Sequence, residues 1–465
     1  MQSESNVKVT IIVPVHNSER YLQQCLESAL AQTLREIEIL CIDSSKSDRC
    51  AQIIADMKDN RITYVKDPDS SYGYKINTGI KMAKGEYVAI LETDDQMFPD
   101  MVEKLYSAGE LYHVDMVNAD YCEFFDCKGG KFWEEFKLYN SFPVYDHLMS
   151  CTAKTCTDTV TGNNDREFGV KFSNRSANGE NDAEYYTISA DHLWTALYRK
   201  SFLLTHNIRL NESPGASYQD ASFIFLTGLL AKSVYHLDEP LYWYRTDNAG
   251  SSVNDNQKIF EMADEHQFLK RELEKRNVKD VGVWNLFYYR KYKAFHWNYL
   301  RLPEKARELF LKRYLEELQS DIAAGVVRRE MCDRALYQWT FLLMDDLEKF
   351  KAILAEERQH RSFMTMPEIL NRLEGRDVVV FGAGMWGRKV LDVLRQNENR
   401  IVKICDNAEK LHGTTLAGVE IGPVAETTKR FPNACYLIVS RGRSDEMRAH
   451  LLAEGIPEGN IEIFR

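Results

Sequence analysis

Short apolar runs alternate with amphipathic stretches over the first hundred residues of the chain. The first three apolar runs fill residues 9–15, 37–42 and 62–65, and polar residues follow each of them. Between the first two runs, apolar residues recur over 22–30 at the three- and four-residue spacing of a helix. The pattern predicts strands alternating with helices, which is the order that builds a parallel sheet.

A fourth apolar run, residues 87–91, leads directly into Glu92, Asp94 and Asp95. A continuous apolar run is typical of a central parallel strand, and the acids fall at its carboxyl end, where α/β sheets bind ligands. Carboxylates this close repel one another unless a cation lies between them. The pattern indicates Mn²⁺ or Mg²⁺ held by oxygen ligands. The alternative is a solvated acidic turn before the helix that begins near Pro99.

Polar residues at the ends of several predicted strands are expected to meet. Right-handed crossovers bring the carboxyl ends of parallel strands to one edge of the sheet. The residues gathered there are His16, Asn17, Asp43, Asp94 and Asp95.

The turn-rich stretch at residues 70–79 lies between the third run and the acidic one. A loop here could place Lys75 and Asn77 against a nucleotide. An ordinary loop followed by the start of a helix is the alternative.

These segments together resemble the family 2 glycosyltransferases. The matching stretches are residues 9–15 with Asn17, Glu19 and Tyr21, residues 37–43, Asn77-x-Gly79, and residues 83–95. The resemblance implies an α/β domain of the GT-A fold. It also implies that the enzyme moves a sugar from a nucleotide diphosphate to an acceptor hydroxyl with inversion.

The same resemblance assigns roles to individual residues. It implies that Asp43 reads the base, that Asp94 lies near the ribose and the metal, and that Asp95 binds the metal. The nucleotide-binding candidates before the first helix are Pro14, His16, Asn17 and Glu19.

Three positions depart from the family pattern, and they weaken the expected recognition of the base. His16 stands where Tyr is common, Ser44-Ser45 replaces the usual Asp-Gly, and Ile76 stands where an Arg usually precedes Asn77.

Two later positions complete the resemblance. The family carries a Glu-Asp pair at the start of a helix, and its Asp acts as the base. Here Gln219 and Asp220 occupy those places, so the likeness implies that Asp220 is catalytic; a helix cap is the alternative. Arg245 would contact the diphosphate bidentately, or instead pair with a surface acid.

The pattern changes after residue 254. Residues 163–182 before that point are polar and predict a long loop, whereas residues 255–370 predict long helices. Aromatic residues recur on one helical face at Trp284, Tyr288, Tyr292, Phe295 and Tyr299. This stripe favours a packed core over a binding face for a polyanionic glycan.

The last ninety residues read as a Rossmann-like unit. A strand at 377–381 precedes a glycine-rich turn and a helix, and a second strand at 401–405 ends at Asp406. The glycines of the turn are Gly382, Gly384 and Gly387. The unit resembles the small nucleotide-sugar-binding domains of sugar acyltransferases and other envelope-sugar enzymes. It could hold a nucleotide or NAD, or nothing.

Length and composition set the remaining expectations. A chain of 465 residues predicts several domains, here 1–254, 255–370 and 371–465. A net charge of −11 argues against nucleic acid as a partner. The ten cysteines lack zinc-site spacing and indicate reduced thiols. Neither a signal peptide nor a membrane span is expected, so we expect a cytoplasmic protein; peripheral attachment to the inner membrane face stays open.

The sequence thus predicts an α/β protein with a GT-A domain, a central helical region and a small Rossmann-like domain. We expect a metal-dependent inverting hexosyltransferase with a nucleotide-sugar donor, UDP-sugar being favoured. The acceptor would be a glycan or lipid-linked hydroxyl, in bacterial surface polysaccharide synthesis. Homo-oligomerisation stays open. The rival interpretation is a non-catalytic nucleotide-sugar sensor or scaffold that works through its C-terminal unit. A second rival, a nucleotidyltransferase, would normally show a glycine-rich basic loop after the first strand, and Pro14-Val15-His16-Asn17 is not such a loop.

Overall fold

The computed structural model describes most of the chain. The described residues are 7–127, 130–136, 147–152, 155–160, 170–175, 181–186, 192–216, 218–248, 250–251, 255, 257–328, 335–360, 366–440 and 443–464. The chain divides into two compact units. The first unit contains Met1–Glu123, Glu135–Tyr244 and Asn248–Phe350, and the second contains Phe124–Glu134, Arg245–Asp247 and Lys351–Arg465. The predicted division at residues 254 and 370 stays a prediction.

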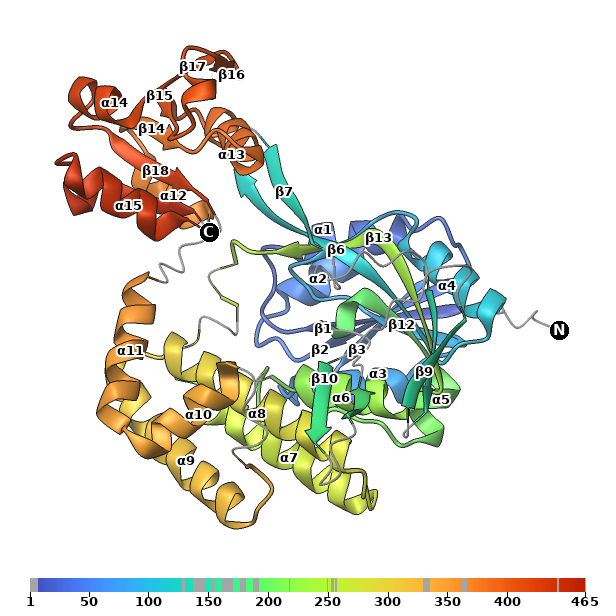
Figure 1. The fold of residues 1–465 in the computed structure, drawn as a ribbon. Helices are drawn as coiled ribbons and strands as arrows, with labels where there is room; N and C mark the ends of the chain where they lie inside the picture. Colours follow the sequence, from blue (N-terminus) through green and yellow to red (C-terminus); the bar gives the residue numbers. More distant parts are fainter. Residues whose placement is uncertain are drawn as a thin grey trace. The chain divides into compact units, whose positions relative to one another are not determined.

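The first unit begins with the predicted parallel sheet (Figure 1). Strand β1 (Val9–Val15) is buried throughout and pairs in parallel with β2 (Ile37–Asp43) and β4 (Tyr87–Ile90). Strand β3 (Ile62–Lys66) pairs in parallel with β2. The intervening helices are α1 (Leu22–Leu30), α2 (Arg49–Asp56), α3 (Tyr72–Met82) and α4 (Met101–Tyr112). The α/β fold class is confirmed.

Antiparallel strands extend this sheet beyond β4. Strand β12 (Ala196–Arg199) pairs with β4 and with β6 (Met116–Cys127), and β13 (Ser233–Arg245) follows β6 in the strand order. The remaining strands of the sheet are β5 (Gln96–Met97), β7 (Gly130–Phe136), β8 (His147–Thr152) and β9 (Thr155–Val160).

The prediction of one long loop over residues 163–182 is wrong in part. Strands β10 (Val170–Arg175) and β11 (Asn181–Tyr186) form an antiparallel pair within and just beyond it. Backbone hydrogen bonds can hold such a pair with few apolar residues, so polarity alone misled the prediction. Residues 163–169 and 176–180 lie outside the described residues.

Helices form the rest of the first unit, as predicted. They are α5 (Lys200–Thr205), α6 (Asp220–Leu230), α7 (Glu261–Lys275), α8 (Val281–Arg301), α9 (Glu304–Ala323), α10 (Ala335–Asp345) and α11 (Leu347–His360), which extends past Phe350 into the second unit. Four members of the aromatic stripe are buried, namely Tyr288, Tyr292, Phe295 and Tyr299. The stripe is therefore core, as expected.

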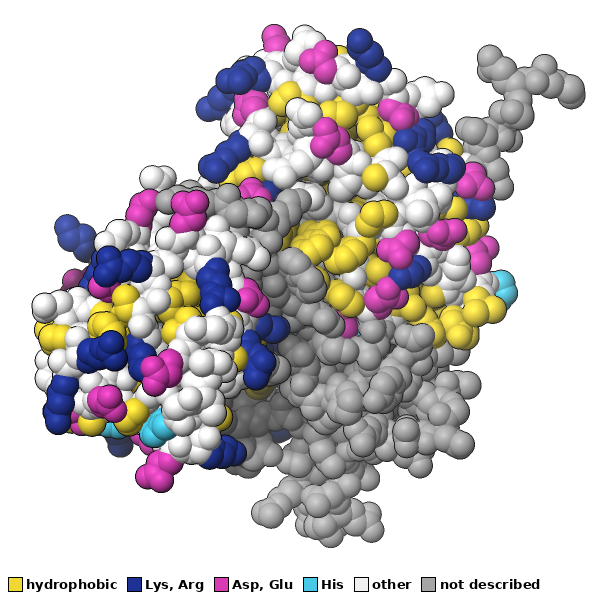
Figure 2. All heavy atoms as spheres, turned by 90° about the horizontal axis from the view of Figure 1, so that it is seen from above, with side chains coloured by type: hydrophobic (Ala, Val, Ile, Leu, Met, Phe, Trp, Pro, Cys, Tyr) yellow, Lys and Arg dark blue, Asp and Glu magenta, His cyan; other side chains and the backbone are white. Residues whose placement is uncertain are grey.

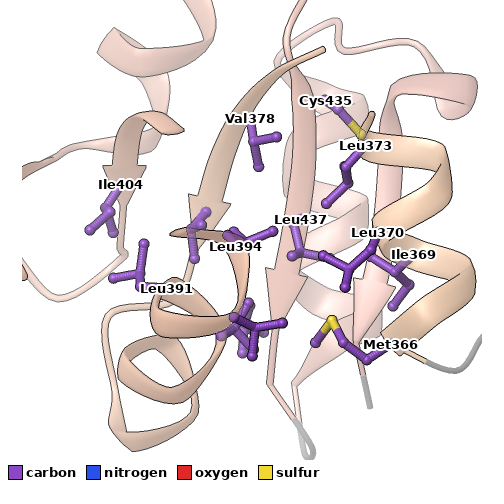
Figure 3. Close-up of a cluster of buried hydrophobic side chains, with 14 of the residues drawn as sticks. Met366, Ile369, Leu370, Leu373, Val378, Leu391, Leu394, Ile404, Cys435 and Leu437 are labelled. Atoms are coloured by element: carbon purple, nitrogen blue, oxygen red, sulfur yellow. The ribbon is translucent and has the colours of Figure 1, made fainter. Parts of the chain in front are cut away.

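The second unit contains a six-stranded sheet in the order β16-β17-β15-β14-β18-β19. Its elements are α12 (Met366–Leu373), β14 (Asp377–Phe381), α13 (Met385–Gln396), β15 (Arg400–Cys405), β16 (Thr415–Leu416), β17 (Val419–Gly422), α14 (Val424–Arg430), β18 (Cys435–Val439), α15 (Ser444–Ala453) and β19 (Ile461–Phe464). Val378 and Val380 of β14 face a core that α12 and α13 cover (Figure 3). Val379 and Phe381 face a second core with α14 and α15. This two-sided covering accounts for the continuous apolar run.

The surface carries both signs of charge. On the face shown in Figure 2, lysine and arginine side chains lie interspersed with acidic ones. Each helix in the described part of the chain is too short or too polar to cross a membrane.

Candidate active site

Asp43 lies at the carboxyl end of β2 with its side chain completely buried. The Ser45 N–H donates to Oδ1 at 2.6 Å, the Tyr64 hydroxyl donates to Oδ2 at 2.9 Å, and Lys66 Nζ lies 3.3 Å from Oδ2. Burial alone would raise the pKa of Asp43, but these hydrogen bonds and the Lys66 charge outweigh it and lower the pKa. Asp43 is therefore a fixed anion at the sheet edge.

The loop after β1 is tied to the loop after β2. His16 Nδ1 lies 3.0 Å from Ser44 Oγ. Asn17 adopts a positive φ of 49°, and its N–H donates to Ser45 Oγ at 2.8 Å. Asn is one of the few non-glycine residues that tolerate this conformation. The loops around His16 and Asp43 thus form one wall, as the sequence predicts.

Two further nucleotide-binding candidates lie in the same region. Pro14 is opposite Ile42 in the β1–β2 register. Glu19 Oε1 accepts a hydrogen bond from Ser47 Oγ at 2.7 Å, which adds a second tie between the two loops.

Lys75 of α3 makes contacts at the carboxyl ends of β1 and β2. Its side chain is buried, and Nζ donates to the Val15 carbonyl at 3.1 Å and to Ser44 Oγ at 3.0 Å. Burial lowers the pKa of Lys75 to about 8, although the charges of Glu92 and Asp43 act in the opposite direction. Lys75 brings a positive charge to the predicted nucleotide pocket.

The acidic cluster begins at Glu92, just past the end of β4. The Tyr72 hydroxyl donates to Glu92 Oε1 at 2.5 Å. Burial raises the pKa of Glu92 to about 7, and the charges of Asp94 and Asp220 also raise it. Asp94 Oδ2 accepts from Asn248 Nδ2 at 2.7 Å.

Asp95 and the backbone of Glu92 share one tyrosine. The completely buried Tyr242 hydroxyl donates to Asp95 Oδ2 at 2.9 Å and accepts from the Glu92 N–H at 3.1 Å. Cys25 Sγ donates to the Glu92 carbonyl at 3.3 Å. These contacts fix the acidic turn against β13 and α1.

Asp220 begins helix α6, half-buried. Burial raises its pKa, and backbone N–H groups at the helix start partly oppose the rise. The charge of Asp220 also raises the pKa of Tyr72, after burial and Glu92, and that of Glu92. The structure therefore brings Asp220 close to the acidic cluster, across more than 120 residues of sequence.

Asn77 has contacts of its own. It is buried, its Nδ2 donates to the Leu210 carbonyl and to Glu212 Oε1, both at 2.9 Å, and its Oδ1 accepts from the Leu210 N–H at 3.0 Å. These bonds hold the segment that leads to Asp220. A nucleotide contact for Asn77 stays a prediction.

Gln219, in the place of the family's Glu, also holds that segment. It is buried, and its Nε2 donates to Ser213 Oγ at 2.9 Å and to the Gly215 carbonyl at 3.0 Å. An amide can donate to the Gly215 carbonyl, whereas an ionised glutamate has no proton to donate to it.

Arg245 belongs to the second unit. Its buried Nη1 lies 2.7 Å from Asp126 Oδ2 and 2.9 Å from Asp247 Oδ1, and its guanidinium stacks over Phe124 at 4.5 Å. The alternative of pairing with acids is therefore observed, and its contact with a diphosphate stays a prediction.

The acidic cluster suits a metal that is shared with a substrate. Among the described residues, no group of three or more His, Cys, Asp or Glu side chains is arranged to hold a metal ion. A phosphate-bridged Mg²⁺ needs only one or two carboxylates, because phosphates and water complete its shell. Half-buried Asp94 fits this requirement, with Asp95 fixed beside it.

The second unit contains a separate pocket of about 270 Å³. Its lining includes Gly382, Gly384, Trp386, Asp406 and Arg443. Gly382 has a positive φ of 118°, and a Cβ there would lie 2.7 Å from the Val439 carbonyl, so the turn requires glycine.

Asp406 closes the glycine turn through its carboxylate. The Ala383 N–H donates to Oδ2 at 2.7 Å and the Ala408 N–H to Oδ1 at 2.8 Å. A Cβ at Gly387 would lie 2.2 Å from the Gly382 carbonyl. Nucleotide binding by these residues stays a prediction.

The sequence did not single out Tyr72 or Tyr242 as site residues. Both act through a hydroxyl on a distant acid, and their own segments carry no pattern that pairs them with residue 92 or 95. Glu92 itself carried a signal, because it stands in the acidic run.

The ends of the parallel strands gather a fixed anion, a buried lysine and a carboxylate cluster at the edge of the sheet where α/β proteins bind ligands. Residues 10–202 match the family described as glycosyl transferase family 2. The resemblance to the family 2 glycosyltransferases is therefore confirmed over this part of the chain.

Three known proteins illustrate the similarity. GlyA, a glycosyltransferase of Streptococcus pneumoniae, is 31% identical over 151 residues, or 30% of this chain and 21% of GlyA. EpsH of Bacillus subtilis is 27% identical over 257 residues, or 54% of this chain and 65% of EpsH. The crystal structure of S. aureus TarS 1-349 in complex with UDP-GlcNAc aligns over 72% of this chain and 91% of TarS 1-349, with 18% identity and a TM-score of 0.37. The chain thus spans less than two thirds of GlyA and of EpsH.

Proposed function

We propose that the protein is an inverting glycosyltransferase that moves a hexose from a nucleotide diphosphate, UDP being favoured, to a hydroxyl of a glycan or lipid-linked acceptor. The family 2 match over residues 10–202 and the relatives' assignment as glycosyltransferases support this activity. Surface polysaccharide synthesis is the setting that we favour.

The donor would lie along the sheet edge. Asp43 would interact with the base, as the family resemblance implies, and the loops around His16 and Asn17 would flank the nucleoside. Asp94, with Asp95 beside it, would hold Mn²⁺ or Mg²⁺. Such an ion supplies positive charge where the leaving diphosphate becomes more negative.

Asp220 is the proposed general base. The acceptor oxygen bonds to C1 of the sugar, the bond from C1 to the diphosphate oxygen breaks, and Asp220 takes the hydroxyl proton. The raised pKa of Asp220 makes its carboxylate a stronger base than an exposed one. Attack opposite the leaving group inverts the anomeric centre.

One observation carries the proposal above the others. Asp220 lies close enough to Glu92 and Tyr72 that its charge raises the pKa of both. A helix-capping aspartate elsewhere on the surface would not do this. The base candidate and the acidic cluster therefore share one region of the first unit.

The test is release of nucleotide diphosphate from a panel of nucleotide sugars, with Mn²⁺ or Mg²⁺ and candidate acceptors. We expect Asp220→Asn to lower the transfer rate about 100-fold or more, because it removes the base. Donor binding, followed by thermal shift, should persist. Asp94→Ala should weaken metal-dependent donor binding as well.

Asp48→Asn is the matched control, since Asp48 is an exposed N-cap residue without a side-chain capping bond. It should leave the rate unchanged. Wild-type transfer rates in Asp220→Asn would remove the base assignment. Donor binding without any release of nucleotide diphosphate would favour the sensor alternative, with the pocket at Gly382 as its site.

A further inference from the structure

The residue two positions before the proposed base has an unusual backbone. Tyr218 has a positive φ of 64°, a region that bulky residues rarely occupy unless their surroundings impose it. Its carbonyl accepts the Ala221 N–H at 3.0 Å, at the first turn of α6. The conformation of Tyr218 therefore sets where Asp220 begins the helix.

Helix α8 holds the Tyr218 ring in place. Trp297 meets the ring edge-on, with centroids 5.9 Å apart. The Arg301 guanidinium lies 5.5 Å from the centroid of the Tyr218 ring and 5.4 Å from that of Trp297. A cation over the faces of two aromatic rings is attracted to both of them. We name Tyr218, Trp297 and Arg301 the clamp.

Arg301 is itself fixed by three acceptors. Its Nε donates to Asn298 Oδ1 at 2.8 Å, its Nη1 donates to the Asp255 carbonyl at 3.1 Å, and its Nη2 donates to the Lys258 carbonyl. Lys258 Nζ in turn donates to the Ala216 carbonyl. The helical region thus contacts the loop before Asp220 twice, at the backbone of Ala216 and at the ring of Tyr218.

The ring of Tyr218, and not its hydroxyl, makes these contacts. The hydroxyl is buried and has no hydrogen-bond partner among the described residues. Burial raises the pKa of Tyr218 to about 12, so the phenol stays protonated at neutral pH. Phenylalanine could therefore replace tyrosine with little loss.

We propose that Tyr218 is a positioning residue for the transfer reaction: the clamp keeps it in a strained conformation that places the Asp220 carboxylate against the acceptor hydroxyl. This inference rests on the proposed function of Asp220. If residue 218 had only to form a tight turn, glycine would suit its positive φ best. Glycine fills that role in the same loop at Gly215. The tyrosine instead connects the base to α8.

The test compares Tyr218→Gly with Tyr218→Phe in the full chain. Glycine tolerates the positive φ but has no ring to contact Trp297 and Arg301. Helix α8 would then no longer fix the position of Asp220. We expect the single-turnover rate at saturating donor to fall about 100-fold, the loss expected from a small misplacement of a reacting group. The donor KM should change less than about twofold, because the donor side is untouched. Tyr218→Phe should keep the wild-type rate.

Trp297→Ala removes the α8 partner of the Tyr218 ring. This variant replaces Tyr218→Gly in the test if Tyr218→Gly fails to fold. It should also slow transfer with the donor KM preserved, and the double variant should be no slower than Tyr218→Gly alone. An active wild-type enzyme whose Tyr218→Gly or Trp297→Ala variant keeps the full rate would overturn the inference. An inactive wild-type enzyme would instead overturn the proposed function.

Discussion

At the scale of single residues, Glu92 stands out because burial raises its pKa to about 7. The charges of Asp94 and Asp220 act on it together with burial, and the Tyr72 hydroxyl donates to its Oε1 at 2.5 Å. Perturbed carboxyl groups of this kind concentrate at functional sites, where stability is given up for chemistry.

Glu92→Gln should stabilise the protein above pH 7 and change little at pH 5. The pKa of Glu92 is raised to about 7 in the folded state, so the folded protein holds this proton more tightly than the unfolded chain. The free energy of unfolding therefore falls as pH rises from about 4.5 to about 7. Glutamine removes that fall, which is worth at most about 3 kcal/mol at pH 8. Urea denaturation at pH 5 and pH 8 measures it.

Glu308→Gln is the control, because Glu308 is exposed on α9. It should change stability by less than about 0.5 kcal/mol at either pH. An equal effect of Glu92→Gln at both pH values would contradict the assigned cause.

Residue types at strand ends could be predicted from the sequence, whereas their partners could not. Asp43 and Asp220 stood out through strand ends and family likeness. The hydroxyl of Tyr242 reaches Asp95 only because β13 pairs with β5 in a particular register. Cross-strand register over such a separation is a tertiary property that local patterns do not carry.

At the scale of elements, helix α3 contacts both the proposed donor site and the segment that leads to the proposed base, Asp220. Lys75 contacts the β1 end, Tyr72 contacts Glu92, and Asn77 holds the loop around Leu210. Helix α3 thus ties the two segments to one element.

Gly73→Ala should slow transfer by disturbing this helix. A Cβ at residue 73 would lie 1.9 Å from the Asn211 carbonyl oxygen, so α3 or the loop must move. We expect a loss of about 1–3 kcal/mol in the free energy of unfolding, typical of overpacking, and at least a tenfold lower rate. Denaturation and single-turnover assays measure both.

Gly459→Ala provides the comparison, since a Cβ there meets nothing within 4 Å. It should behave as wild type. A Gly73→Ala enzyme with normal rate and stability would show that the loop adapts freely.

The parallel half of the sheet was predictable because its strands are short and separated by amphipathic helices. The antiparallel half was not. Strand β12 inserts between β4 and β6 although it lies some seventy residues after β6 in the chain. Polar strands such as β10 and β11 lack the apolar period that marks a strand.

At the scale of the whole molecule, the second unit is built from three separate stretches of chain. Residues 124–134 and 245–247 belong to it together with 351–465. Phe125 is 4% exposed and packs in the core cluster that α12 and β14 also form. The C-terminal segment is thus not a simple appendage.

Deletion of residues 351–465 should expose Phe125 and make the remaining chain aggregate, as judged by light scattering. Phe125→Ala in the full chain should cost about 3 kcal/mol of stability, because it empties a buried site. A truncated chain that stays monomeric and as stable as before would contradict this assignment of Phe125 to the C-terminal core.

The clamp has a practical consequence for building hybrid enzymes. Lys258 and Arg301, which steady the loop before Asp220, both follow residue 254. A crossover point at residue 254 would join the loop before Asp220, the proposed base, from one parent enzyme to the supporting helices from another. Breakpoints placed before residue 207 or after residue 302 would keep the loop and the helices that support it together, so both could be exchanged as one segment.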